Sequence, residues 1–275
     1  HFDKNHENSY HKFFDNFSHL KNNLIQRKKE KYLINGFKTL RPLNLLWLVR
    51  WPKMFLEFNN FKFLLENILE EIDNEFVMFV PDDQIFYKKT IIPEKALDLI
   101  SENKHSMYYR FFTGNHFLGK YSLPPKLNVE TFEDNGINFF KWSNKDRNAI
   151  NLWNYRFTIE GTIFHKEGLL NLLKPMIYHN PITLEAIGLW ESRFRNLFVN
   201  GLSAEKRTAA TFNINNVQQL VKTPNSFHSP EKLMEYYNLG YRLQYNDKDF
   251  DDTQLDIVPK KISLKHVSTG KIINI

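Results

Sequence analysis

The chain has 275 residues, of which 42% are hydrophobic and 25% charged, a composition that is ordinary for a globular protein with one large domain. It contains no cysteine, which excludes disulfides, thiolate zinc sites and cysteine nucleophiles and favours a reducing compartment. No run of about 18 apolar residues is present to span a bilayer. We therefore expect a cytoplasmic protein.

The net charge of +6 is concentrated at the amino-terminal end. Residues 1–60 hold 11 Lys and Arg against 5 Asp and Glu, whereas the remaining residues hold 26 of each. This basic segment, with the run Arg27–Lys29, either is attracted to an anionic membrane surface or phosphorylated substrate, or is a solvated helix face. The apolar stretch Leu43–Phe55 fits burial in the core or a peripheral contact with the inner membrane face.

The first regular elements that we expect are a helix, a strand and a second helix. Apolar residues recur at helical spacing over 61–72, which predicts an amphipathic helix. The apolar run 76–80 follows without a polar break and predicts a strand buried on both faces, ended by Pro81. The segment 90–101, with Pro93 suited to its first turn, predicts the next helix.

Helices and strands continue to alternate along the rest of the chain. Strands are predicted over 107–112, 137–142, 157–165 and 209–214, and helices over 166–173, 184–198 and 230–238. Ser229 and Gly240 suit the two caps of the last helix. The tail 261–275 alternates around Thr269-Gly270, which is typical of a hairpin. This order predicts a layered α/β protein.

Two adjacent acids, Asp82 and Asp83, follow the strand predicted over 76–80. In open α/β sheets, ligands bind at the carboxyl ends of the strands. Two neighbouring carboxylates repel each other, and a hard cation such as Mg²⁺ or Mn²⁺ relieves that repulsion while it binds substrate phosphates. The alternative is a plain turn, because Pro-Asp-Asp also favours turns.

With its flanking residues, the pair resembles the strand-then-acid motif of GT-A glycosyltransferases, in the style of family 2. The segment runs Phe76-Val77-Met78-Phe79-Val80-Pro81-Asp82-Asp83-Gln84-Ile85. The resemblance implies that Asp83 ligates the metal directly and that Asp82 faces the donor ribose or the waters of the metal. Pro81 stands where such motifs carry a first acid, and Gln84 follows the pair.

Two later motifs follow in the order that the family shows. The segment around Glu160 and Gly161 resembles the glycine-containing loop beneath the donor sugar, and Asn180–Glu185 resembles the acidic motif that opens the acceptor-side helix. The resemblance implies Glu185 as the base that deprotonates the acceptor, with Glu160 as the second candidate. The alternatives are a carboxylate at a helix N-terminus for Glu185 and an ion pair with Arg156 for Glu160.

Three further residues complete the predicted site. Arg110 follows Tyr108-Tyr109 on the strand predicted over 107–112 and is suited to bidentate contact with the donor phosphates, with Asn115 a few residues further on. A surface arginine is the alternative for Arg110. His228 is a candidate third metal ligand, as a late histidine is in some GT-A enzymes.

The resemblance implies a GT-A-like α/β fold with a mixed, mostly parallel sheet flanked by helices and a small C-terminal β appendage. We expect a glycosyltransferase domain over 1–245 and an extension, folded as a hairpin, over 246–275. Because the chain begins with His1, we expect the first nucleotide-binding strand of such a fold upstream of it.

These expectations combine into a metal-assisted, inverting hexosyltransferase of polysaccharide biosynthesis. It would move a sugar from a nucleotide-sugar donor to a glycan or lipid-linked acceptor, without binding nucleic acid. Two alternatives stay open. One is a metal-dependent nucleotidyl or phosphoryl transferase. The other is a non-enzymatic binder that uses the basic, aromatic amino-terminal segment to hold a surface or a nucleic acid.

Overall fold

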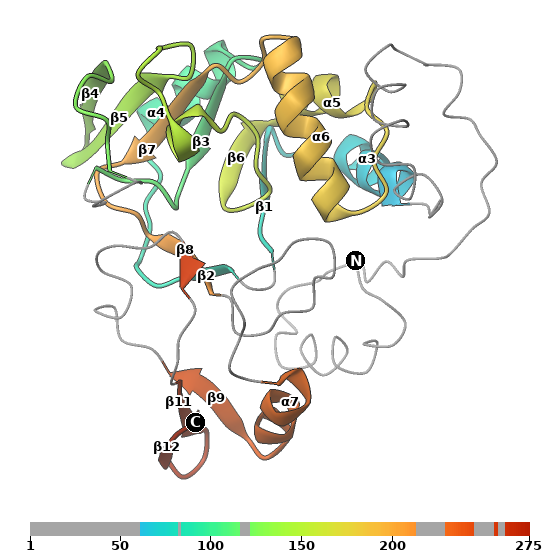
Figure 1. Cartoon of the computed structure of the whole chain (residues 1–275), viewed down its shortest axis with the longest axis vertical. Coiled ribbons are helices and arrows are strands. Elements are labelled where there is room, and N and C mark those ends of the chain that lie inside the picture. Colours follow the sequence, from blue (N-terminus) through green and yellow to red (C-terminus); the bar gives the residue numbers. More distant parts are fainter. Residues whose placement is uncertain (1–60, 82–83, 116–121, 213–228, 245–255, 258–261) are drawn as a thin grey trace. The chain divides into compact units, whose positions relative to one another are not determined.

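The computed structural model describes residues 61–81, 84–115, 122–212, 229–244, 256–257 and 262–275 (Figure 1). The chain divides into two units, which are described separately. Of the described residues, the helical unit holds 61–75 and 166–195, and the sheet unit holds those within 76–165 and 196–275. The predicted basic segment and the apolar stretch after it lie outside the described residues.

The helical unit contains α3 (Phe61–Glu71), α5 (Lys166–Leu173) and α6 (Pro181–Phe194). The amphipathic pattern predicted α3, which buries Phe61 and Leu69. The segment predicted for α5 matches the observed helix, whereas α6 begins three residues earlier than expected and ends at Phe194. Within the described part of the chain, no helix is both long enough and apolar enough to cross a bilayer.

One cationic side chain joins α3 to the end of α5. The Lys62 ammonium contacts the Glu66 carboxylate and donates to the carbonyl oxygens of Leu173 and Lys174, each at 3.2 Å. A positive charge at the carbonyl end of a helix is favourable. Burial of the Lys62 ammonium lowers its pKa. The ring of Tyr178 lies with its centroid 5.1 Å from this ammonium. Burial of the Tyr178 hydroxyl and the nearby Glu66 carboxylate raise the pKa of Tyr178.

The sheet unit is built on a six-stranded sheet in the order β1-β6-β3-β7-β5-β4. Its strands are β1 (Phe76–Phe79), β3 (Met107–Arg110), β4 (Val129–Asp134), β5 (Ile137–Ser143), β6 (Thr162–His165) and β7 (Asn200–Ala204). Among these strands only β3 and β7 pair in parallel, so the prediction of a mostly parallel sheet is wrong for the described residues. One reason is local: Asn135 and Gly136 adopt positive φ and form a two-residue turn that requires β4 and β5 to be antiparallel.

The strand predicted to be the most buried lies at the margin of this sheet. Among the described strands, β1 pairs with β6 alone, and Met78 and the following Val80 are 39% and 49% exposed. Every residue of β3 and of β6 is instead buried. The prediction of burial on both faces is wrong for β1 because apolar side chains do not reveal how many neighbouring strands a segment acquires.

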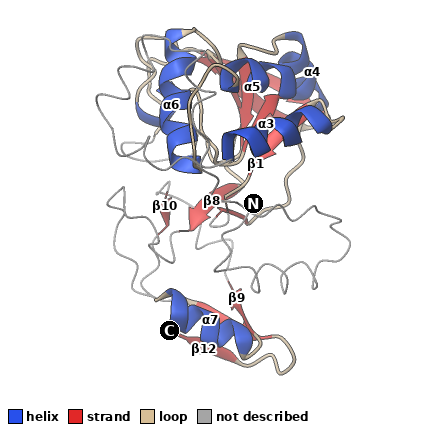
Figure 2. Cartoon of the chain, turned by 90° about the vertical axis from the view of Figure 1, so that its right-hand side faces the viewer, coloured by secondary structure: helices blue, strands red, loops and turns tan. Residues whose placement is uncertain are grey.

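Both faces of the sheet are covered within the sheet unit. One face packs against α4 (Glu94–Glu102), which follows the cap residue Pro93 and runs along the sheet (Figure 2). The cluster on this face contains Ala96, Ile100, Met107, Tyr109, Phe111, Phe139, Ile163, Leu202 and Ala209. The opposite side holds an aromatic cluster of Tyr108, Phe140, Trp142, Trp153, Phe157, Phe164 and Phe198, in which neighbouring ring centroids lie 4.9–6.1 Å apart.

A second, small sheet has the order β10-β8-β2, with β2 (Gln84–Phe86), β8 (Ala209–Phe212) and β10 (Asp256–Ile257).

The strand predicted over 157–165 is shorter than expected, because β6 begins only at Thr162 and the residues before it form a loop after the short helix η5 (Asn151–Asn154). Five described strands, β2, β4, β7, β9 (Tyr241–Gln244) and β10, were not predicted.

The C-terminal part forms a three-stranded antiparallel sheet with one helix. β11 (Ser263–His266) and β12 (Ile272–Asn274) form the predicted hairpin, and β9 (Tyr241–Gln244) adds the third strand. The predicted helix α7 (Pro230–Asn238) contacts β9, and the Ser229 side chain caps it by accepting from the Lys232 amide at 3.1 Å. Since β9 precedes residue 246, this sheet begins before the predicted extension.

We expect Tyr109→Phe to make the protein more resistant to alkaline unfolding. Burial raises the pKa of Tyr109 from 10.0 to about 12. The folded state therefore keeps a proton that the unfolded state releases above pH 10, and stability is lost between pH 10 and pH 12. The loss from this group is on the order of 2 kcal/mol at pH 12. Urea unfolding at pH 8 and pH 11.5 measures it.

Tyr237→Phe, at a partly exposed position on α7, is the control for this prediction and should leave the pH profile unchanged. An equal alkaline loss of stability in the wild type and in Tyr109→Phe would contradict the prediction.

Candidate active site

The carboxyl ends of β1 and β3 meet at the start of β6. Because β6 is antiparallel to both strands, its first residues lie between their ends. The Gly161 amide donates to the Phe79 carbonyl oxygen at 3.1 Å, and the Phe111 amide donates to the Gly161 carbonyl oxygen at 3.0 Å. We call Phe79, Gln84, Phe111 and Gly161 the strand-end site.

The acidic pair is flanked by two residues at this edge. The backbone amide of Gln84 donates to the Pro81 carbonyl oxygen at 3.1 Å, and Gln84 is the first residue of β2. Asp82 and Asp83 lie outside the described residues, as does His228, so their roles as metal ligands stay predictions. Among the residues that the structure describes, no three His, Asp or Glu side chains cluster closely enough to hold a metal ion.

The side chain of Gln84 was not predicted to be functional, yet it is the most unusual polar group of the strand-end site. It is only 8% exposed, and neither Oε1 nor Nε2 has a hydrogen-bond partner in the described part of the chain. The amide packs against Gly161, where φ is +40° and a Cβ would collide with Nε2 and lie 3.1 Å from Cδ. The signal in the sequence was a lone amide between two acids and the apolar pair Ile85-Phe86.

Glu160 was predicted to lie within a strand, but it lies in the loop before β6. Its amide donates to the Thr158 hydroxyl at 3.2 Å, and its carbonyl oxygen accepts from the Thr162 hydroxyl at 2.8 Å. These bonds set the backbone directly before Gly161. Glu160, which is half-buried, is therefore the described acid that the chain places next to the strand-end site.

Glu185 belongs to the helical unit, whereas the strand-end site belongs to the sheet unit. It is the fifth residue of α6, and the first turn of that helix holds no acid. The helix start is capped instead by Asn180, whose side chain accepts from the Thr183 amide at 2.8 Å, while the Thr183 hydroxyl accepts from the Asn180 amide at 3.1 Å. The role of Glu185 as a base stays a prediction.

Arg110 is fully buried, which excludes the surface arginine that was the alternative. Its Nη1 donates to the Leu152 carbonyl oxygen at 3.0 Å, and its Nη2 donates to the Tyr155 carbonyl oxygen. The guanidinium carbon lies 4.6 Å and 5.0 Å from the ring centroids of Tyr108 and Phe112. Arg110 thus joins β3 to the segment around η5, and its contact with donor phosphates stays a prediction.

Asn115, also predicted to bind the donor, is exposed just before residues 116–121, which lie outside the described residues. Its amide donates to the Glu205 carbonyl oxygen at 2.9 Å. The position is thus at a turn beyond the end of β3, and its contact with the donor stays a prediction.

A second buried arginine, Arg207, lies near this edge and was not predicted. Its guanidinium lies 6.0 Å from the ring centroid of Tyr87, and its carbonyl oxygen accepts from the Tyr87 hydroxyl at 3.0 Å. The next residue joins two strand ends, because Thr208 accepts from the Tyr87 amide at 3.1 Å and donates to the Phe111 carbonyl oxygen at 2.9 Å. β2 is thereby held beside the end of β3.

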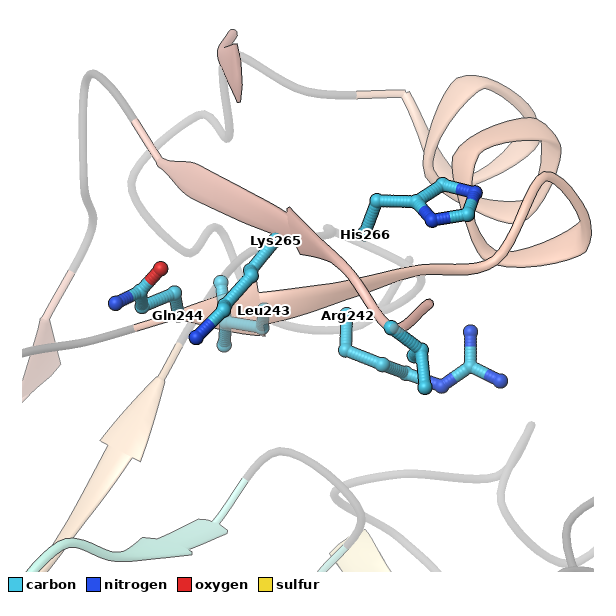
Figure 3. A pocket seen from close by; sticks show the side chains of 6 residues that line it. Arg242, Leu243, Gln244, Lys265 and His266 are labelled. Atoms are coloured by element: carbon cyan, nitrogen blue, oxygen red, sulfur yellow. The ribbon is translucent and has the colours of Figure 1, made fainter. Parts of the chain in front are cut away.

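Two surface hollows lie away from these residues. One, of about 390 Å³, is lined by Arg242, Leu243, Gln244, Lys265, His266 and Val267, and another, of about 370 Å³, lies around β5. In Figure 3 the side chains of Lys265 and Arg242 point in different directions instead of converging, and Arg242 stacks on Tyr237 at 3.9 Å. Neither hollow contains a predicted site residue, so the chemistry of the strand-end site, and not hollow size, identifies the candidate site.

Part of the chain is similar to a known protein. Over 129 residues the chain is 24% identical to the "Bifunctional glycosyltransferase pgtA" of Dictyostelium discoideum, a match that covers 45% of this chain and 17% of that protein. The chain therefore matches less than a fifth of that relative's length. The chain matches no protein-family model. No solved structure matches it significantly.

We expect Arg110→Met to destabilise the protein by about 3 kcal/mol, because two buried carbonyl groups lose charged hydrogen-bond donors. Urea unfolding measures this loss. Arg147→Met, at an exposed position, is the control and should change stability by less than about 0.5 kcal/mol. Unchanged stability together with lost nucleotide binding would contradict the structural role and return Arg110 to the donor phosphates.

Proposed function

We propose that the chain is a glycosyltransferase domain that takes a sugar from a nucleoside-diphosphate donor at the strand-end site. The observation that carries the proposal is that Gly161 joins the carboxyl ends of β1 and β3 at the place where the chain enters the acidic pair. Ligands of α/β sheets bind at such ends. The similarity to a glycosyltransferase over 129 residues supports the same reaction class.

The carboxylates of the acidic pair fit a hard divalent cation, since carboxylate oxygens are the preferred ligands of Mg²⁺ and Mn²⁺. Asp83, with Asp82, would hold the ion, and His228 is the candidate third ligand. When bound, the ion would neutralise the diphosphate as it departs from the sugar. In the reaction, the acceptor oxygen bonds to the anomeric carbon, the bond from that carbon to the diphosphate breaks, and the acceptor proton passes to a carboxylate base.

Glu160 is the better supported of the two candidate bases. It directly precedes Gly161 in the sequence and belongs to the same unit as the strand-end site. The hydroxyls of Thr158 and Thr162 bond to its backbone and set the chain directly before Gly161. Glu185 remains the rival, on the resemblance of its motif to that of GT-A enzymes.

We expect UDP or GDP to raise the melting temperature in the presence of Mn²⁺ and to have little effect without it, because only ligands of the native state stabilise it. CMP, which has no diphosphate, should have little effect in either case. In Asp83→Asn the metal-dependent shift and sugar transfer should disappear, while the melting temperature of the free protein stays within about 2 °C. Asp98→Asn, at an exposed position on α4, is the matched control.

Normal transfer by Asp83→Asn would overturn the metal assignment. A shift with oligonucleotides or anionic lipid, and none with any nucleotide, would favour the non-enzymatic binder.

We expect Glu160→Gln to lower kcat by about 100-fold or more and to remove the acidic limb of the pH–rate profile, since a glutamine cannot accept the acceptor proton. Glu185→Gln is measured in parallel, with the exposed Glu167→Gln as the control. If Glu185→Gln loses activity and the acidic limb while Glu160→Gln keeps both, the base is Glu185.

A further inference from the structure

We propose that the Gln84 amide recognises two adjacent hydroxyl groups of the donor sugar and so selects the sugar that is transferred. The inference rests on the proposed glycosyl transfer and adds a specificity-determining residue to it. It starts from the buried Gln84 side chain, whose two polar atoms have no hydrogen-bond partner within the described residues.

A buried amide without partners is unusual, because nearly all buried polar groups in folded proteins are hydrogen-bonded. The described backbone around Gln84 does not supply partners. Gly161 has already engaged its amide with Phe79 and its carbonyl with Phe111. Gln84 itself pairs with Thr211 in the ladder between β2 and β8. The side-chain amide is therefore suited to a partner that arrives with a ligand.

Gly161 supplies the space for this amide. A side chain at this position would overlap the carboxamide of Gln84, and the positive φ of +40° would also strain any other residue. The absence of a Cβ thus permits the amide to lie against the backbone that joins β1 to β3. Among the residues that the structure describes, packing and not hydrogen bonding holds the amide at the strand-end site.

The chemistry of the amide fits a pair of neighbouring sugar hydroxyls. A carboxamide accepts through Oε1 and donates through Nε2, and a hydroxyl can both donate and accept. The position favours the sugar over the nucleobase. Gln84 directly follows Asp83, and adjacent Cα atoms lie about 3.8 Å apart. If the acidic pair holds the metal–diphosphate group, the sugar attached to the diphosphate is within reach of the Gln84 amide. The nucleobase is further away, because the ribose separates it from the diphosphate.

The test measures the Kd of nucleotide-sugar and of the matching nucleoside diphosphate by calorimetry, in wild type and in Gln84→Leu. The nucleotide is whichever of UDP and GDP stabilises the wild type. We expect Gln84→Leu to weaken binding of the nucleotide-sugar about tenfold or more and to change binding of the nucleoside diphosphate by less than about twofold. The ligand-free variant should melt at the same temperature as the wild type or higher, because two unpartnered buried polar atoms are removed.

Two controls separate recognition from general damage. Gln244→Leu makes the same chemical change at an exposed position on β9 and should leave both Kd values unchanged. A donor that lacks one hydroxyl of the recognised pair should bind wild type and Gln84→Leu with similar Kd, because the deleted hydroxyl and the deleted amide belong to one interaction.

Gly161→Ala gives a second, independent variant. The new methyl group displaces the amide, so binding of the nucleotide-sugar should weaken as in Gln84→Leu, and the double variant should be no weaker. Gly136→Ala also places a side chain at a positive φ, of +78°, but meets no atom within 4 Å. It reports backbone strain alone and should keep the wild-type Kd.

Equal Kd of the nucleotide-sugar for wild type and Gln84→Leu would overturn the inference and leave the proposed function intact. Equal weakening of nucleotide-sugar and nucleoside diphosphate would overturn the assignment to the sugar. Failure of the wild type to bind any nucleotide or nucleotide-sugar would remove the proposed function, and the inference with it.

Discussion

The direction of β6 is the constraint on which the candidate site depends. Because β6 runs antiparallel to both of its neighbours, the carboxyl ends of β1 and β3 lie at the same edge and converge on the residue before β6. That residue, Gly161, bonds to both ends. A parallel strand in this place would bring its own carboxyl end to the edge, and the loop that carries Glu160 would leave from the opposite side of the sheet.

Two buried polar side chains near this edge differ in what satisfies them. The Arg110 guanidinium donates through Nη1 and Nη2 to carbonyl groups of the segment around η5, and these hydrogen bonds stabilise the fold. The Gln84 amide finds no such partner among the described residues. Since an unsatisfied buried group lowers stability, the first residue contributes to folding, and the second is kept at a stability cost that a ligand would offset.

Local signals predicted those elements whose beginning and end depend on neighbouring residues alone. α5 and α7 have their predicted bounds, and Ser229 caps α7 through a bond to a residue three positions away. The C-terminal hairpin also follows from local turn chemistry, with Gly270 at a positive φ of 69°. The apolar spacing predicted α3 because a helix presents one face every three to four residues.

The sequence by itself thus determined the α-helices and seven of the twelve strands of the described residues, and the acidic pair, which two residues separate from β1. Only the tertiary structure decided that β1 lies at the margin of the described sheet, that the small and polar residues of β7 pair with β3 and β5, and that Gln84 packs against Gly161. The physical reason is that caps, turns and periodicity act between residues close along the chain. Strand neighbours and side-chain partners are instead tens of residues apart along the chain, and local sequence patterns do not specify which distant segments pair.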